Sequence, residues 1–222
     1  MAGRLIGMPR PHLDIAFVSD VACPWCAIGL ASLDQALRRV NGEVDAVVRV
    51  EPFELNPDMG PEGAEVIPYL TKKYGRTKEE IARTQATIRE RGAAVGFAFG
   101  TRDHVWNTFN AHRMLHWARL EGRDVELKRA LLRAYHGEGR NPGAPDVLVE
   151  LATAVGLDPV RARSIAESHE FEAEVRARER YWLERGVNGV PFVVVNDQYA
   201  ISGAQPPEAF EQALREISRN AP

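Results

Sequence analysis

The sequence predicts an α/β protein in which a long helical block interrupts a single α/β layer. A strand, helix, strand pattern stands near the start of the chain, strand patterns vanish between about residues 60 and 187, and strands followed by a helix return at the end. The 222 residues, 45% of them hydrophobic, can bury a core without metal or disulfide staples. The cysteines are therefore not needed for folding, and we expect them to have a chemical role.

The first part of the chain predicts two strands around one helix. Residues 14–19 are rich in β-formers and run directly into Cys23 and Pro24. A helix is predicted over 25–40, because apolar residues recur at steps of three and four and Asn41-Gly42 supplies a stop. Val44, Ala46, Val48 and Val50 alternate with Asp45, Val47 and Arg49, which predicts the second strand.

The middle of the chain predicts helices separated by Gly and Pro. Thr77 to Glu80 matches a capping box that opens a helix running to about Arg91, and Asp158 caps a helix that has Pro159 at its first position. Further helices are predicted over 64–73, 108–120, 125–136, 145–155 and 170–185.

The last part of the chain predicts a hairpin and a closing helix. Residues 191–195 and 198–202 are β-rich and flank Asn196-Asp197, two residues that tolerate positive φ. After Pro206-Pro207 the apolar residues return to helical spacing. The predicted division is a discontinuous α/β domain over 11–58 and 187–222, with an inserted helical domain over 59–186.

Charge and hydropathy exclude several function classes. The formal net charge is -3, and 28 Lys and Arg are interspersed with 31 Asp and Glu, so we expect no nucleic-acid partner. No apolar stretch of seven or more residues precedes the first strand, and no run approaches 18 residues. We therefore expect no secretory signal, no membrane partner and a cytoplasmic location, while the sequence predicts no oligomeric state.

The two cysteines form the motif Cys23-Pro24-Trp25-Cys26. Two positions placed at random in this chain would stand three apart about 1% of the time. A cysteine that opens a helix faces unpaired N–H groups and the helix dipole, which stabilise a thiolate. Cys23 is therefore the predicted nucleophile, and Cys26, one turn later, is the predicted resolving thiol. Pro24 stiffens the first turn, and Trp25 adds no charge.

A second motif, Gly189-Val190-Pro191-Phe192, precedes the hairpin. From the residues alone, a trans proline that opens an edge strand is favoured, because only about 5–6% of X-Pro bonds are cis. However, the sequence resembles the DsbA-type branch of the thioredoxin superfamily, especially the cytosolic FrnE-like proteins. The resemblance rests on SDVACPWCAIG, NTFNAHR and GVNGVPFVVVNDQYAISGAQPPEAF.

The resemblance implies a thioredoxin-like fold with an inserted all-helical domain and thiol-disulfide oxidoreductase activity. It also implies a cis peptide between Val190 and Pro191 that faces the CPWC motif. The backbone of Val190 would then pair with an extended peptide or with glutathione.

Three further residues are weaker candidates. Asp20, just ahead of the motif, is a candidate proton relay to Cys26, or else a loop or cap residue. Asn107 and His112 in NTFNAHR are candidate substrate contacts, as the resemblance suggests for glutathione-using isomerases. The alternative for His112 is a structural role with a backbone partner.

The predicted function is disulfide exchange with protein or low-molecular-weight thiols, with no metal or resident cofactor and with glutathione as a candidate co-substrate. One alternative is a glutathione-dependent isomerase or transferase similar to 2-hydroxychromene-2-carboxylate isomerase, a class that presents Ser where Cys23 stands. Another is a metal-binding or interaction module, although a structural zinc site needs four ligands and the chain has two thiols. The direction of exchange is not predicted.

Overall fold

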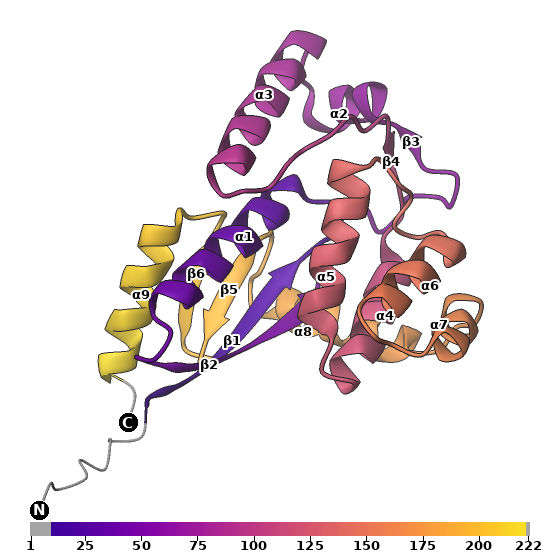
Figure 1. Ribbon diagram of the computed structural model, residues 1–222. Helices are drawn as coiled ribbons and strands as arrows, with labels where there is room; N and C mark the ends of the chain where they lie inside the picture. The colour runs from indigo at the N-terminus through magenta and orange to yellow at the C-terminus, as the bar shows by residue number, and fades with distance from the viewer. Residues whose placement is uncertain (1–9, 221–222) are drawn as a thin grey trace, which may run out of the picture.

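A four-stranded sheet built from both ends of the chain is the centre of the computed structural model, which describes residues 10–220 (Figure 1). Its order is β2-β1-β5-β6, with β1 parallel to β2 and antiparallel to β5. The strands are β1 (His12–Ser19), β2 (Asp45–Pro52), β5 (Phe192–Val195) and β6 (Tyr199–Ser202). The predicted α/β layer is confirmed.

The hairpin between β5 and β6 turns at the two predicted residues. Asn196 and Asp197 have φ of 54° and 53°, in the left-handed region that Asn and Asp tolerate. The Asn196 side chain also accepts a hydrogen bond from the backbone N–H of Asp14 at 2.8 Å. The turn is therefore tied to the start of β1.

Helices cover both faces of the sheet. On one face, α1 (Pro24–Arg39) and α9 (Pro207–Asn220) pack through Leu33 and Phe210 against Ile15 and Phe17 of β1. On the other face, α8 (Glu172–Glu184) packs through Trp182. Because β1 is central in the sheet, its side chains alternate between these two layers.

The helical block supplies the remaining long helices. The capping box opens α3 as predicted: the Glu80 N–H donates to Thr77 Oγ1 at 3.2 Å, and the Thr77 N–H donates to Glu80 Oε2 at 2.8 Å. Asp158 caps α7 by accepting from the Val160 N–H at 3.0 Å. The helices are α2 (Val66–Tyr74), α3 (Lys78–Ala94), α4 (Phe109–Leu120), α5 (Asp124–Leu132), α6 (Pro145–Ala154) and α7 (Pro159–Ala166).

The sequence prediction was wrong at two places in this block. Two-residue strands, β3 (Ala64–Glu65) and β4 (His104–Val105), pair antiparallel, and they are too short for an alternating pattern to reveal. The helix predicted over 125–136 ends at Leu132 and continues as a π-helical turn, Arg133–Gly137. There the carbonyl of His136 accepts from the Gly100 N–H at 2.9 Å, so a tertiary contact replaces the regular helix.

The sheet and the helical block share a core. Val21, Ala22 and Val50 pack in one cluster with side chains of the block such as Tyr135 and Leu127. The turn that leads into the cysteine motif is therefore held by both parts of the chain. The domain boundaries at 59 and 186 stay a prediction.

Glu51 joins the sheet to two helices. Its carboxylate lies fully buried in β2 and accepts from Arg119 at 2.7 Å, from Arg178 at 2.9 Å and from the Trp182 indole at 3.1 Å. These donors lie on α4 and α8. A buried carboxylate is tolerated only with such partners. Removing one member of a buried ion pair leaves the charge of the other without a partner.

We expect Glu51→Ala to lower the free energy of unfolding by about 3 kcal/mol. This is near the lower end of the loss typical of a broken buried ion pair, because both arginines are partly exposed and recover some hydration. Urea unfolding followed by circular dichroism measures it. The control is Glu150→Ala, which removes an exposed ion pair with Arg140. Equal losses in the two variants would contradict the assignment.

Candidate active site

Cys23 stands where the two sequence motifs meet. It is the N-cap residue of α1, followed by Pro24 at the first helical position. Its Sγ lies 3.4 Å from the carbonyl oxygen of Val190, and the residue is 3% exposed. The Val190–Pro191 peptide bond is cis, the geometry that the resemblance implies. The fold thus brings together residues separated by more than 160 positions.

A glycine allows this close approach. A Cβ atom at Gly29 of α1 would lie 2.9 Å from Pro191 Cγ and 3.6 Å from Ala204 Cα. Real Cβ atoms do not come so close to a ring carbon, so a side chain here would push the helix away. Gly29 was not identified from the sequence, although a glycine one turn after Cys26 is a signal of close packing.

Cys26 is the buried member of the pair. It lies one helical turn beyond Cys23 and is 0% exposed, and both residues are free thiols. Burial, followed by the neighbouring Cys23, raises the pKa of Cys26 well above its ordinary value. Ionising Cys26 therefore needs help from its surroundings.

Asp20 is fully buried and fully bonded. Its Oδ1 accepts from the Ala22 N–H at 3.0 Å, from Thr108 Oγ1 at 2.8 Å and from His112 Nε2 at 3.3 Å, while Oδ2 accepts from the Leu55 N–H at 2.7 Å. Burial alone raises the pKa of Asp20, but these bonds, led by His112, outweigh it and lower the pKa to about 2. The carboxylate is thus a weak base near neutral pH, and its contacts favour a structural role over the predicted proton relay.

Lys128 is a residue that sequence reasoning missed. It is 0% exposed on α5, and its Nζ lies 3.4 Å from the carbonyl of Ser19, at the end of β1. Burial lowers the pKa of Lys128, while the charges of Cys26 and then Asp20 act in the opposite direction. A signal existed, because Lys128 stands three positions before the buried Leu131 on the inward helix face.

The two predicted substrate contacts have structural partners. Asn107 donates to the Met59 carbonyl at 2.9 Å and accepts from the Phe109 N–H at 2.8 Å. His112 is 1% exposed and bonded to Asp20. The geometry thus favours a structural role for both residues, although His112 is held by the Asp20 carboxylate and not by the backbone partner that was expected. Contact of Asn107 and His112 with substrate stays a prediction.

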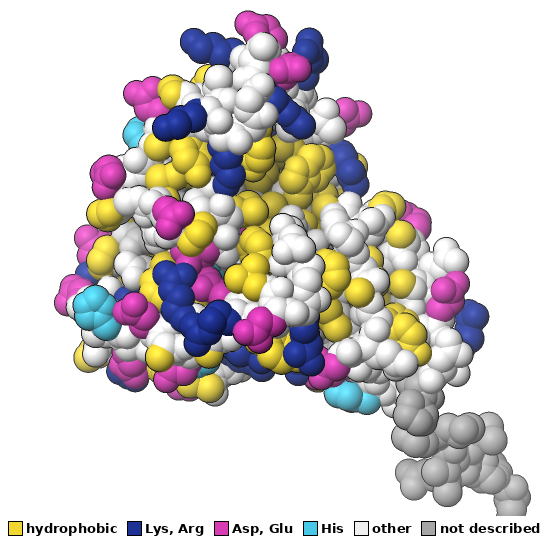
Figure 2. Space-filling view, turned by 180° about the vertical axis from the view of Figure 1, so that it is seen from behind, with side chains coloured by type: hydrophobic (Ala, Val, Ile, Leu, Met, Phe, Trp, Pro, Cys, Tyr) yellow, Lys and Arg dark blue, Asp and Glu magenta, His cyan; other side chains and the backbone are white. Residues whose placement is uncertain are grey.

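Trp25, the third residue of the motif, is partly buried. The guanidinium carbon of Arg91 is 5.3 Å from the centre of its ring, and Arg91 donates to the Ala204 carbonyl at 2.8 Å. Arg91, near the end of α3, thus contacts both the cysteine motif and the segment that follows β6. Figure 2, seen from behind, shows hydrophobic side chains gathered in a hollow below α2 and α3.

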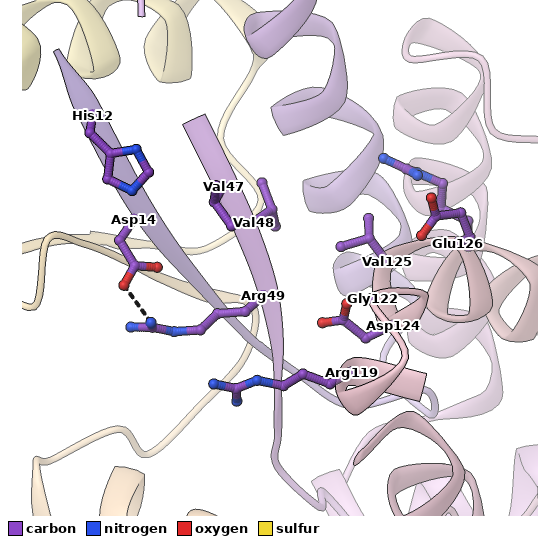
Figure 3. A pocket seen from close by; sticks show the side chains of 11 residues that line it. His12, Asp14, Val47, Val48, Arg49, Arg119, Gly122, Asp124, Val125 and Glu126 are labelled. Atoms are coloured by element: carbon purple, nitrogen blue, oxygen red, sulfur yellow. Dashed lines mark hydrogen bonds and ion pairs between the residues drawn. The ribbon is translucent and has the colours of Figure 1, made fainter. Parts of the chain in front are cut away.

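Hollows elsewhere on the surface are less suited to chemistry. One of about 640 Å³ lies along the outer edge of β2, where Arg49 pairs with Asp14 and the Asp124 carboxylate caps the Val50 N–H at 2.7 Å (Figure 3). It contains no residue of either motif, and most of its charges are already paired. A hollow of about 340 Å³ instead borders Pro24.

Metal and membrane features are absent from the described residues. Within 10–220, no group of three or more His, Cys, Asp or Glu side chains is arranged to hold a metal ion. No helix in the same range is long and apolar enough to cross a bilayer.

A dithiol that opens a helix and faces a cis-proline loop, on a sheet flanked by helices, defines a protein of the thioredoxin-fold class. Residues 14–215 match the family model of the DSBA-like thioredoxin domain. The chain belongs to this family, as the sequence resemblance indicated.

Solved structures agree with this assignment. A probable DsbA oxidoreductase from Streptomyces coelicolor is 36% identical, with a TM-score of 0.85, and the match covers 95% of this chain and 92% of that one. A 2-hydroxychromene-2-carboxylate isomerase is 14% identical (TM-score 0.72, covering 93% and 97%). The cytosolic disulfide reductase DsbM from Pseudomonas aeruginosa, solved with GSH, is 20% identical (0.65, 93% and 99%). The last two show a shared fold alone.

A pair of carboxyl groups lies next to the site. Glu54 directly precedes Leu55, the partner of Asp20, and Arg176 of α8 pairs with both Glu54 and Glu179. Burial, and then the charge of Glu179, raises the pKa of Glu54 to about 8. Glu54 therefore keeps its proton in the folded protein at pH values where the unfolded chain, with a pKa near 4.5, has released it. The contribution of Glu54 to the free energy of unfolding falls as pH rises from about 4.5 to 8.

We expect Glu54→Gln to flatten this part of the pH profile, because a neutral amide removes the ionisation. The variant should gain stability relative to the natural protein between pH 5 and pH 8, measured as the change in urea midpoint. Glu62→Gln, an exposed carboxyl of the same connection, is the control. An identical pH dependence in all three proteins would refute the assignment.

Proposed function

We propose that the protein catalyses thiol-disulfide exchange through Cys23 and Cys26. The observation that carries the proposal is the placement of the Cys23 thiol at the start of α1, against the Val190 carbonyl, with the buried Cys26 one turn behind it. Membership of the DSBA-like family supports it.

The two thiols take different roles. Cys23 attacks a substrate disulfide as the thiolate, which the N–H groups and the dipole of the first helical turn stabilise. Cys26 then attacks the mixed disulfide and releases the substrate thiol. The Val190 carbonyl, next to the Cys23 sulfur, is placed to accept a backbone N–H of an extended substrate.

Lys128 assists the second step in this proposal. Cys26 must lose its proton, and burial opposes that loss. Among the groups that act on the Cys26 pKa, Lys128 is the first that lowers it, so its ammonium favours the thiolate. Asp20, already saturated with donors, instead holds the turn in place. Lys128 is therefore a positioning residue that acts through Cys26.

Glutathione is the proposed co-substrate, and the cytoplasm is the proposed location. The fold shared with a cytosolic reductase solved with GSH supports both proposals. In a compartment rich in reduced glutathione an accessible dithiol is kept reduced, so the favoured direction is reduction or isomerisation of disulfides. Proposed substrates are disulfides of proteins or of low-molecular-weight thiols.

The isomerase alternative is less well supported. The solved isomerase shares the fold with this chain, but at 14% identity. The resemblance drawn from the sequence places Ser in that class where this chain has Cys23. An isomerase would also have no need for the buried Cys26.

We expect a reversible two-electron Cys23/Cys26 couple in a glutathione redox series, lost in both Cys23→Ser and Cys26→Ser. Cys23→Ser should abolish insulin reduction, whereas Cys26→Ser should accumulate a mixed disulfide at Cys23, because the resolving thiol is missing. Thiol trapping and mass spectrometry measure both. Absence of an intramolecular disulfide at every ratio would end the proposal.

We expect Lys128→Met to slow resolution of the mixed disulfide about tenfold at pH 7, equal to about one pKa unit at Cys26. The defect should keep about the same size at pH 9, because the raised pKa of Cys26 still lies above that pH, while the first attack by Cys23 should stay within about twofold. Stopped-flow kinetics separates the two steps. Lys72→Met, at an exposed position on α2, is the control. A defect of similar size in both steps would indicate a structural role alone.

A further inference from the structure

A cationic pocket lies beside the cysteine motif. It has a volume of about 340 Å³ and borders Pro24, the residue that follows Cys23. Its walls come from Gln85, Ile88 and Arg89 of α3, from residues 99–102, and from the π-helical turn. The volume falls at the lower end of the range for small-molecule sites. The lining contains two arginines and no carboxylate.

Arg102 is fixed in this pocket without a counter-ion. Its Nη1 lies 3.5 Å from the Ala22 carbonyl and 3.4 Å from His136 Nδ1, and its guanidinium lies 4.9 Å from the centre of the Tyr135 ring. The residue is half-buried, and within residues 10–220 it forms no ion pair with a carboxylate. A partly desolvated guanidinium with spare donors favours an anionic partner.

His136 orients Arg102 and adds no charge. Its Nε2 lies 2.8 Å from the Val21 carbonyl, an acceptor, so this nitrogen carries the proton and Nδ1 is left to accept from Arg102. Burial, and then the charge of Arg102, lowers the pKa of His136 well below its ordinary value. The imidazole is therefore neutral near pH 7, and it holds the guanidinium in one orientation.

Arg89 of α3 supplies a second cation to the lining of the pocket. It is exposed on α3 and forms no ion pair within the described part of the chain. Gln85 and Thr101 add neutral hydrogen-bonding groups to the lining. Guanidinium groups bind carboxylates through paired N–H donors, and fixed geometry reduces the entropy lost on binding.

We propose that this pocket binds a carboxylate of a low-molecular-weight thiol or of its disulfide, and that it thereby presents the sulfur to Cys23. The inference rests on the proposed function and adds a substrate class, namely small anionic disulfides. A ligand anchored on Arg102 lies next to the motif, because Arg102 contacts Ala22, the residue before Cys23.

The exchange balances with the small disulfide as oxidant. The Cys23 thiolate attacks one sulfur of the disulfide, a Cys23–S bond forms, and one small thiolate leaves. The Cys26 thiolate then attacks Cys23 Sγ and releases the second thiolate. The protein loses two electrons and two thiol protons, and the disulfide becomes two small thiols.

The first test compares disulfides of different charge. We expect Arg89→Gln and Arg102→Gln to slow oxidation of the reduced protein by glutathione disulfide about tenfold, a loss of about 1.4 kcal/mol of interaction. Oxidation by hydroxyethyl disulfide, which is neutral, should change less than about twofold. The matched control is Arg83→Gln, an exposed arginine of the same helix that does not line the pocket. Equal losses with both disulfides, or no loss, would overturn the inference.

The second test needs no redox chemistry. S-methylglutathione cannot exchange, and we expect it to bind the natural protein more tightly than its diethyl ester, in which both carboxylates are masked. Titration calorimetry should show about a tenfold weaker affinity in Arg89→Gln, whose exposed side chain is not needed for folding. Equal affinity for the acid and the ester would overturn the inference. A protein that binds the acid but forms no Cys23–Cys26 disulfide would refute the proposed function alone.

Discussion

The buried Asp20 carboxylate is the interaction on which the position of the motif depends. A carboxylate without contact to water is tolerated only when its lone pairs are satisfied, and here donors come from the motif turn, from the connection after β2 and from α4. Each of these segments is therefore fixed relative to the end of β1. Cys23 directly follows the turn that Asp20 holds. The position of Cys23 against Val190 is therefore fixed by this turn as well as by α1.

A single ionised carboxylate also sets the electrostatics beneath the motif. Lys128 lies under the same end of β1; burial lowers its pKa, and the charges of Cys26 and then Asp20 act in the opposite direction. The charge of Lys128 thus acts on Cys26, the proposed resolving thiol, and lowers its pKa against the effect of burial.

Local patterns in the sequence were sufficient for several elements in both parts of the chain. The period of α1, the Asn-Asp turn and the Thr77 capping box each depend on neighbours within a few residues, and all were confirmed. The roles proposed for Lys128 and Arg102 depend on tertiary packing, which brings α5 and the segment around residue 102 next to the cysteine motif. The π-helical turn at 133–137 likewise follows from the contact with Gly100, which no local period encodes.

The two parts of the chain therefore divide the chemistry. In the proposed function the sheet layer supplies the reacting groups, Cys23 and Cys26, together with the Val190 carbonyl. The helical block supplies the groups proposed to control them: Thr108 and His112, which bond to Asp20, the buried Lys128, and the Arg102–His136 pair. A thiol pair at a helix start can serve many substrates, so discrimination must come from what surrounds it. Differences in substrate choice between related proteins should then follow changes in the block.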